Sequence, residues 1–118
     1  MTERWRQMVI FGITPSQSGE RLWQPAADVY RTSDGWIVKF DLAGVSLEDI
    51  EVSLSGCHLR VRGVRRDTLL REGYSYYQLE LAYSRFERAI TFPCLIDSSD
   101  IVSEYRDGLL ILRLTCRS

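Results

Sequence analysis

The sequence predicts an all-β protein in which two antiparallel sheets pack face to face as a β-sandwich. Three observations predict it. Apolar and polar residues alternate in most segments, which is typical of half-buried strands. Turn signals recur at short intervals, and almost no segment has a helical period. The 118 residues have the size of one domain, and a chain of this length buries about two thirds of its unfolded surface.

Residues 101–114 carry the clearest local pattern. Asp107 and Gly108 separate two runs that are rich in apolar residues. This dipeptide is typical of a two-residue hairpin loop, in which both residues need a positive φ. The loop predicts three residue pairs on one mostly apolar face: Tyr105–Leu110, Ser103–Leu112 and Ile101–Leu114. Such a hairpin needs further strands to cover that face.

The other strands are expected between residue 28 and Pro93, which ends the last of them because proline cannot join a central ladder. A second Asp-Gly turn is predicted at Asp34-Gly35, and a short helical turn at 47–49. Residues 65–75 are polar and interrupt the pattern, and a short strand is expected within 76–81. The remaining predicted strands are 28–33, 36–42, 50–54, 59–63 and 84–92.

An N-terminal arm is expected at residues 1–22, outside a domain that spans 23–114. Trp5, Met8 and Val9 are spaced as on one face of a short helix. Exposed apolar segments usually bind other chains, so the arm is predicted to contact other subunits or non-native proteins. The alternative is that the arm packs back on its own domain. The apolar residues of the arm are Trp5, Met8, Val9, Ile10, Phe11 and Ile13.

Composition excludes several classes of function. A net charge of −1 gives no reason to expect nucleic acid or a membrane surface as a partner. No apolar run approaches the ~18 residues of a membrane span. Cys57, Cys94 and Cys116 lack the spacing of a disulfide framework or a zinc site, which predicts reduced thiols and a cytoplasmic protein.

Catalytic chemistry is not expected either. His58 is the only histidine, so no Ser-His or Cys-His catalytic set is predicted. His58 follows Cys57, and neighbouring residues on a strand point to opposite faces, which argues against a shared metal. The sequence therefore predicts a protein that is not an enzyme and that binds no cofactor.

The order of several motifs resembles the α-crystallin domain of the small heat shock proteins, an immunoglobulin-like β-sandwich, in its bacterial type. Ala43 stands where that family has proline, and Ser84 where it has glycine. The matching motifs are Trp23-Gln24-Pro25 with Asp28 and Tyr30, Asp41-Leu42-Ala43-Gly44-Val45, Leu59-Arg60-Val61-Arg62-Gly63, Phe92-Pro93, and Ser103 with Asp107-Gly108-Leu109-Leu110.

The resemblance implies an ATP-independent holdase that binds partly unfolded proteins and keeps them from aggregating. It also implies a homodimer, in which a strand within 76–81 pairs with residues 28–31 of the partner, and it leaves a higher or hetero-oligomer open. Arg88 is expected to form a partly buried ion pair near this contact, with Glu80 or Asp100 as candidate acids. The implied interface residues are Asp28, Val29, Tyr30, Tyr76, Tyr77, Leu79 and Arg88.

The resemblance further implies a peptide groove between two edge strands of opposite sheets. Its expected lining residues are Val52, Leu54, Ile101, Ser103 and Tyr105. In the family an Ile-x-Ile segment of a C-terminal tail fills this groove. Residues 115–118 lack that motif, and the alternation of Val9, Phe11 and Ile13 leads to the hypothesis that the arm replaces it.

Two other functions remain open at this point. The same domain could serve as a structural or assembly protein of the spore-coat or gas-vesicle type. It could also serve as an adaptor that docks one defined partner.

Overall fold

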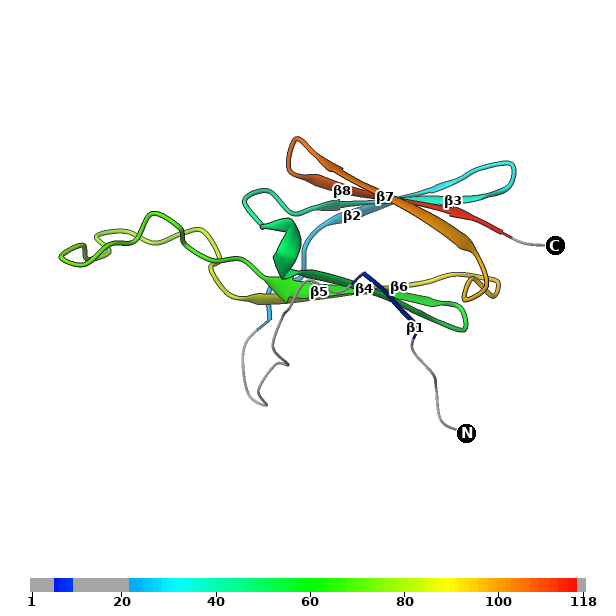
Figure 1. Cartoon of the computed structure of the whole chain (residues 1–118), viewed down its shortest axis with the longest axis horizontal. Coiled ribbons are helices and arrows are strands. Elements are labelled where there is room, and N and C mark those ends of the chain that lie inside the picture. Colours follow the sequence, from blue (N-terminus) through cyan, green and yellow to red (C-terminus); the bar gives the residue numbers. More distant parts are fainter. Residues whose placement is uncertain (1–5, 10–21, 117–118) are drawn as a thin grey trace.

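Two four-stranded antiparallel sheets pack face to face (Figure 1) in the computed structural model, which describes residues 6–9 and 22–116. This confirms the predicted β-sandwich. A single turn of 3₁₀ helix, η1, lies at the predicted place, Leu47–Asp49. One sheet has the order β1 (Arg6–Val9), β4 (Ile50–Ser55), β5 (His58–Val64) and β6 (Arg85–Thr91). The other has the order β2 (Ala27–Arg31), β3 (Gly35–Asp41), β8 (Leu109–Thr115) and β7 (Asp100–Arg106).

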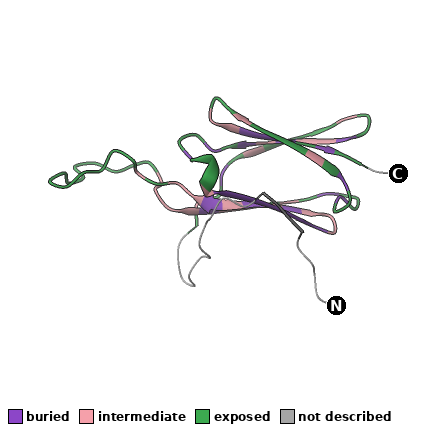
Figure 2. Cartoon of the chain, in the orientation of Figure 1, coloured by how far each residue is buried: buried purple, intermediate pink, exposed green. Residues whose placement is uncertain are grey.

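The core lies between the two sheets, where the strands present their buried residues (Figure 2). The predicted alternation is confirmed, because Val38 and Phe40 of β3 and Leu42 directly after it are fully buried. Burial of each such side chain stabilises the fold by about 1.5–3 kcal/mol. Opposite them lie core residues of the other sheet: Val52, Leu54, Leu59, Val61 and Phe86.

The final hairpin has the predicted register. β7 and β8 pair Tyr105 with Leu110, and the two-residue loop places Asp107 at a φ of 53° and Gly108 at a φ of 77°. Asp107 is the one non-glycine residue with a positive φ in the described part of the chain. The turn therefore fixes which face of β8 enters the core.

The predicted Asp34-Gly35 turn is wrong in its register. β2 and β3 pair Arg31 with Trp36, so four residues separate this last pair, and only Thr32, Ser33 and Asp34 lie outside the strands. The Thr32 N–H donates to the Gly35 carbonyl at 2.9 Å. Glycine is required at position 35 because the β8 backbone passes close to it: a Cβ atom there would lie 1.8 Å from the Leu114 carbonyl oxygen.

Residues 6–9 of the arm pair with their own domain. β1 pairs antiparallel with β4, with Arg6 opposite Leu54 and Val9 opposite Val52. The predicted helix is therefore wrong for Met8 and Val9, whereas Trp5, Ile10, Phe11 and Ile13 lie outside the described residues. An edge strand offers a row of main-chain donors and acceptors, and β1 uses those of β4. β4 is thus an inner strand, and its predicted edge position is wrong.

The segment between β5 and β6 is a long loop that projects away from the sandwich (Figure 1). It contains no strand, so a strand within 76–81 is not formed in the single chain. A strand needs a neighbour for its main-chain hydrogen bonds, and the sandwich offers none at this distance. Several large apolar side chains of the loop are exposed: Leu69, Leu70, Tyr74, Tyr76, Tyr77, Leu79 and Leu81.

We predict that Gly63→Ala destabilises the protein by about 3 kcal/mol or more. A Cβ at Gly63 would lie 1.9 Å from the Asp49 carbonyl oxygen and 2.7 Å from Phe86. Gly73→Ala is the control, because nothing lies within 4 Å of its Cβ and only its φ of 88° is strained, at a cost of about 1–2 kcal/mol. Urea unfolding followed by tryptophan fluorescence measures both, and equal losses would contradict the close approach at Gly63.

Candidate functional site

A small apolar cavity opens where the two sheets part, between η1 and β4 on one side and β7 and β8 on the other. Its volume is about 80 Å³. Leu47 of η1 is 44% exposed at its rim, whereas Ile50 and Leu110 reach it from the core. The lining residues are Leu47, Ile50, Val52, Ser103, Glu104, Tyr105 and Leu110.

The structure brings three of the five expected groove residues to this cavity: Val52, Ser103 and Tyr105. Leu54 and Ile101 do not line it. Leu54 is fully buried in the core, and Ile101 packs against that core. Leu47, Ile50, Glu104 and Leu110 were not predicted from the sequence. The available signal for Leu47 was a leucine in a predicted helical turn directly before the strand of the expected groove.

Tyr105 holds the cavity wall in place. Its hydroxyl donates a hydrogen bond of 2.7 Å to the Leu42 carbonyl oxygen, which ties β7 to the segment that follows β3. Burial raises the pKa of the Tyr105 phenol above its usual value, and the nearby Asp41 carboxylate acts in the same direction. The neutral phenol is therefore the form that the folded protein favours.

A second surface lies along β2, the outer strand of its sheet. Val29 and Tyr30 are exposed, and no described strand pairs with the outer edge of β2. Lys39 donates to the Tyr30 hydroxyl at 2.9 Å and lies 3.5 Å from Asp28. The hydrogen bond to Tyr30 and the Asp28 charge raise the pKa of Lys39. These contacts order the face of the strand and leave its outer main-chain groups to other partners.

The loop residues of the expected interface lie apart from β2 in the single chain (Figure 1). Tyr76, Tyr77 and Leu79 are exposed. The Tyr76 hydroxyl donates to Asp67 at 2.7 Å. This bond lowers the pKa of Asp67 and raises that of Tyr76.

Arg65 anchors the base of the loop and was missed by the sequence analysis. Its guanidinium donates to the carbonyl oxygens of Ala82 at 2.8 Å and Ala43 at 3.0 Å. It also lies 4.1 Å from the centre of the Trp23 ring, within the range of a cation–π contact. Both ends of the loop are thereby held against the sandwich.

Arg88 has a different partner from the one expected. Its guanidinium donates to the Pro25 carbonyl oxygen at 2.9 Å, a main-chain acceptor rather than a carboxylate. The bond ties β6 to the segment that leads into β2.

The expected separation of Cys57 and His58 is wrong. Cys57 lies in the turn between β4 and β5 rather than on a strand, and its Sγ is 3.8 Å from Nε2 of His58. Nδ1 of His58 lies 3.1 Å from the Thr91 hydroxyl. Within residues 6–9 and 22–116, no three His, Cys, Asp or Glu side chains gather as a metal site requires. None of the helices in those residues has the length and apolar character needed to cross a membrane.

Comparison with known proteins identifies the family. The family model of the Hsp20/alpha crystallin family matches residues 28–117. The chain belongs to this family. The match confirms the resemblance inferred from the motifs, and it includes both β2 and the strands that bound the cavity.

Two relatives are identical to the chain at 30% or more of the aligned positions. It is 33% identical over 102 residues to spore protein SP21 of Stigmatella aurantiaca, covering 86% of this chain and 60% of that protein. It is 30% identical over 116 residues to 18 kDa antigen 2 of Mycobacterium avium, covering 96% and 74%. The chain spans about three fifths of the length of the first curated relatives that it matches.

Solved structures share the fold. Heat shock protein 16.0 of Schizosaccharomyces pombe aligns with a TM-score of 0.69 and 29% identity, over 79% of this chain and 86% of that one. The hspA protein of Xanthomonas axonopodis aligns with a TM-score of 0.66 and 28% identity, over 82% and 97%.

We predict that Tyr105→Phe weakens the alkaline loss of stability. The pKa of Tyr105 is raised in the folded protein, so the phenol ionises first in the unfolded state. The contribution of Tyr105 to the free energy of unfolding is therefore complete below the pKa of the unfolded state, about 10, and is lost as the pH rises through the pKa of the folded state. Urea midpoints measured from about pH 8 to pH 11 should fall less steeply in the variant than in the parent. Parallel curves would contradict this assignment. Below pH 8 the variant should lose about 1 kcal/mol with the bond to Leu42.

Proposed function

We propose that the protein is an ATP-independent holdase, a binding protein rather than an enzyme, which captures partly unfolded chains before they aggregate. The observation that carries the proposal is the apolar cavity between the two sheets in a member of the Hsp20/alpha crystallin family. A binding surface of this kind needs no nucleotide, because capture follows from mass action with exposed apolar segments. Family membership and the S. pombe heat shock protein of similar fold support the proposal.

The cavity suits an extended apolar segment. β7 is the outer strand of its sheet, so its free main-chain groups can pair with such a segment while a side chain enters the cavity between Leu47 and Tyr105. Peptides that bind at a sheet edge gain affinity from main-chain bonds and specificity from pockets for alternate side chains. The small volume admits one medium-sized apolar side chain, which favours short apolar stretches of many different clients.

The arm supplies a further proposed client surface. β1 lies along β4, the strand that contributes Val52 to the cavity. The apolar residues of the arm are proposed to add contacts to a client held at the cavity. Several weak contacts on one assembly add through avidity.

We further propose a homodimer formed by strand exchange, in which residues 76–81 pair with the outer edge of β2 in a second copy. The loop carries exposed apolar side chains and forms no strand in its own subunit. The edge of β2 has no described neighbour. The small heat shock protein of Xylella fastidiosa, 25% identical, has a distinct high-order structure, which supports assembly beyond one chain.

A structural role in spores is the second candidate. The observation that favours it is the 33% identity to a protein named spore protein SP21. In that case the chain should assemble but give no protection of a heated client.

We predict that Ser103→Arg lowers client protection at least several-fold. Ser103 lines the cavity, and an arginine there would place a charge where an apolar side chain binds. Light scattering of a heated model enzyme without nucleotide measures the protection. Val102→Arg is the matched control. It adds the same charge to the same strand, at a position that is 64% exposed and does not line the cavity. The proposal would be contradicted if the two variants lost client protection equally, or if the parent protein gave no protection.

We predict that Gln78→Pro converts the dimer into monomers. Proline removes a main-chain donor and cannot join a ladder. Glu72→Pro is the control in the same loop. Glu72 lies in a turn closed by the bond from the Tyr74 N–H to the Arg71 carbonyl, and Gly73 follows it with a φ of 88°; proline suits that turn position. Native mass spectrometry reports the oligomer, and a dimer that survives Gln78→Pro would reject the exchange.

A further inference from the structure

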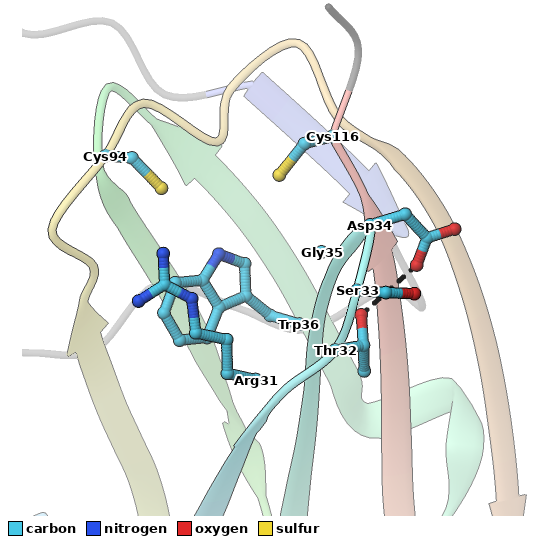
Figure 3. A pocket seen from close by; sticks show the side chains of 8 residues that line it. All are labelled: Arg31, Thr32, Ser33, Asp34, Gly35, Trp36, Cys94 and Cys116. Carbon is cyan, nitrogen blue, oxygen red and sulfur yellow. Dashed lines mark hydrogen bonds between the residues drawn. The ribbon is translucent and has the colours of Figure 1, made fainter.

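Two cysteines that are distant in the sequence face one cavity at the end of the sandwich opposite the long loop. Cys94 lies in the loop after β6, and Cys116 directly follows β8. Both line an open cavity of about 290 Å³, together with Trp36 and the β2–β3 loop. In Figure 3 the two sulfur atoms point toward one another from opposite sides of this cavity. Separate reduced thiols were expected from the sequence, because the spacing of the cysteines does not indicate that Cys94 and Cys116 share a cavity.

We propose that Cys94 and Cys116 form an oxidation site, at which a peroxide or a small disulfide oxidant joins them in an intramolecular disulfide. Both are free and exposed, so an oxidant can reach either sulfur. The bond would connect the last strand of one sheet to the loop that leaves the other sheet. No other covalent link between the sheets exists among the described residues.

The local backbone permits the closure. A disulfide needs its two Cβ atoms about 3.5–4.5 Å apart, so the loop must move across the open cavity. Its anchors lie on either side of Cys94. The Phe92 N–H donates to the Cys57 carbonyl at 2.8 Å, and the Ile96 N–H donates to the Gly56 carbonyl at 2.9 Å. Both anchors are buried, whereas residues 93–95 between them are exposed and can shift without disturbing the core.

Cys116 is the fixed side of the pair. Its N–H donates to the Asp34 carbonyl at 2.8 Å, which continues the ladder of β3 and β8. Trp36 lies beneath the cavity, held by an edge contact of 5.0 Å with the Phe92 ring and by Arg31 stacked at 5.1 Å. These contacts keep the floor of the cavity rigid while the Cys94 segment moves.

The chemistry balances with hydrogen peroxide as the oxidant. One sulfur attacks a peroxide oxygen, which gives a sulfenic acid and one water molecule. The second sulfur then displaces the oxygen of the sulfenic acid as a second water molecule, and the S–S bond forms. Overall the two thiols lose two protons and two electrons, and the peroxide takes up both and is reduced to two water molecules.

Cys57 provides an internal control. It is half-buried, its sulfur contacts the His58 ring at 3.8 Å, and it does not line the cavity. We expect the disulfide to form in Cys57→Ser as in the parent, and to be lost in both Cys94→Ser and Cys116→Ser.

The test is oxidation of the purified full chain with hydrogen peroxide, followed by intact mass and peptide mapping without reductant. The expected product is a chain that is lighter by two hydrogens and has no covalent bond to a second copy, with peptides containing Cys94 and Cys116 joined, at a rate independent of protein concentration. The oxidised chain should also unfold at a higher temperature than the reduced chain, because the bond closes a loop in the unfolded state. A bond to Cys57, a bond between two chains, or separate oxidation of each sulfur would overturn the proposal.

Discussion

The structure depends on how the outer strands of the two sheets satisfy their main-chain hydrogen-bonding groups. A two-sheet sandwich buries most of its inner faces, as the core from Val38 to Leu114 shows, but each sheet ends in strands with unused main-chain donors and acceptors. One edge is covered locally: β1 lies along β4. At β6, Trp23 exchanges main-chain bonds with Arg85 and Glu87. β2 and β7 have no described neighbour on their outer sides. The proposed dimer contact and the proposed client groove lie at these two strands.

Rigid packing and an accessible cavity are compatible here because the same inward-facing side chains contribute to both. Val52 and Leu110 belong to the core and also reach the cavity. Tyr105 closes the structure locally through its bond to Leu42, and Leu47 remains exposed at the rim. The packing of the two sheets therefore forms the cavity in the free chain. A segment could bind there without opening the core.

The two ends of the sandwich have different characters. At one end, Arg65 fixes the base of a long loop whose apolar side chains find no partner in their own subunit. At the other end, short turns are tied together by main-chain bonds between the β4–β5 turn and the segment after β6. Assembly is proposed at the first end and oxidation at the second, so each could change without directly altering the other.

By itself, the sequence determined the strands from β2 to β8, the final hairpin with its register, and the family, but not β1 or the absence of a strand within 76–81. Alternation and the Asp107-Gly108 turn are local signals, and each acts within a few residues. Only the tertiary structure decided that β1 covers β4, that Leu54 is fully buried in the core, and that Cys94 and Cys116 share a cavity. Strand order and side-chain proximity depend on contacts between segments far apart in the chain, and a period of two residues shows which face a side chain takes but not which neighbour it meets.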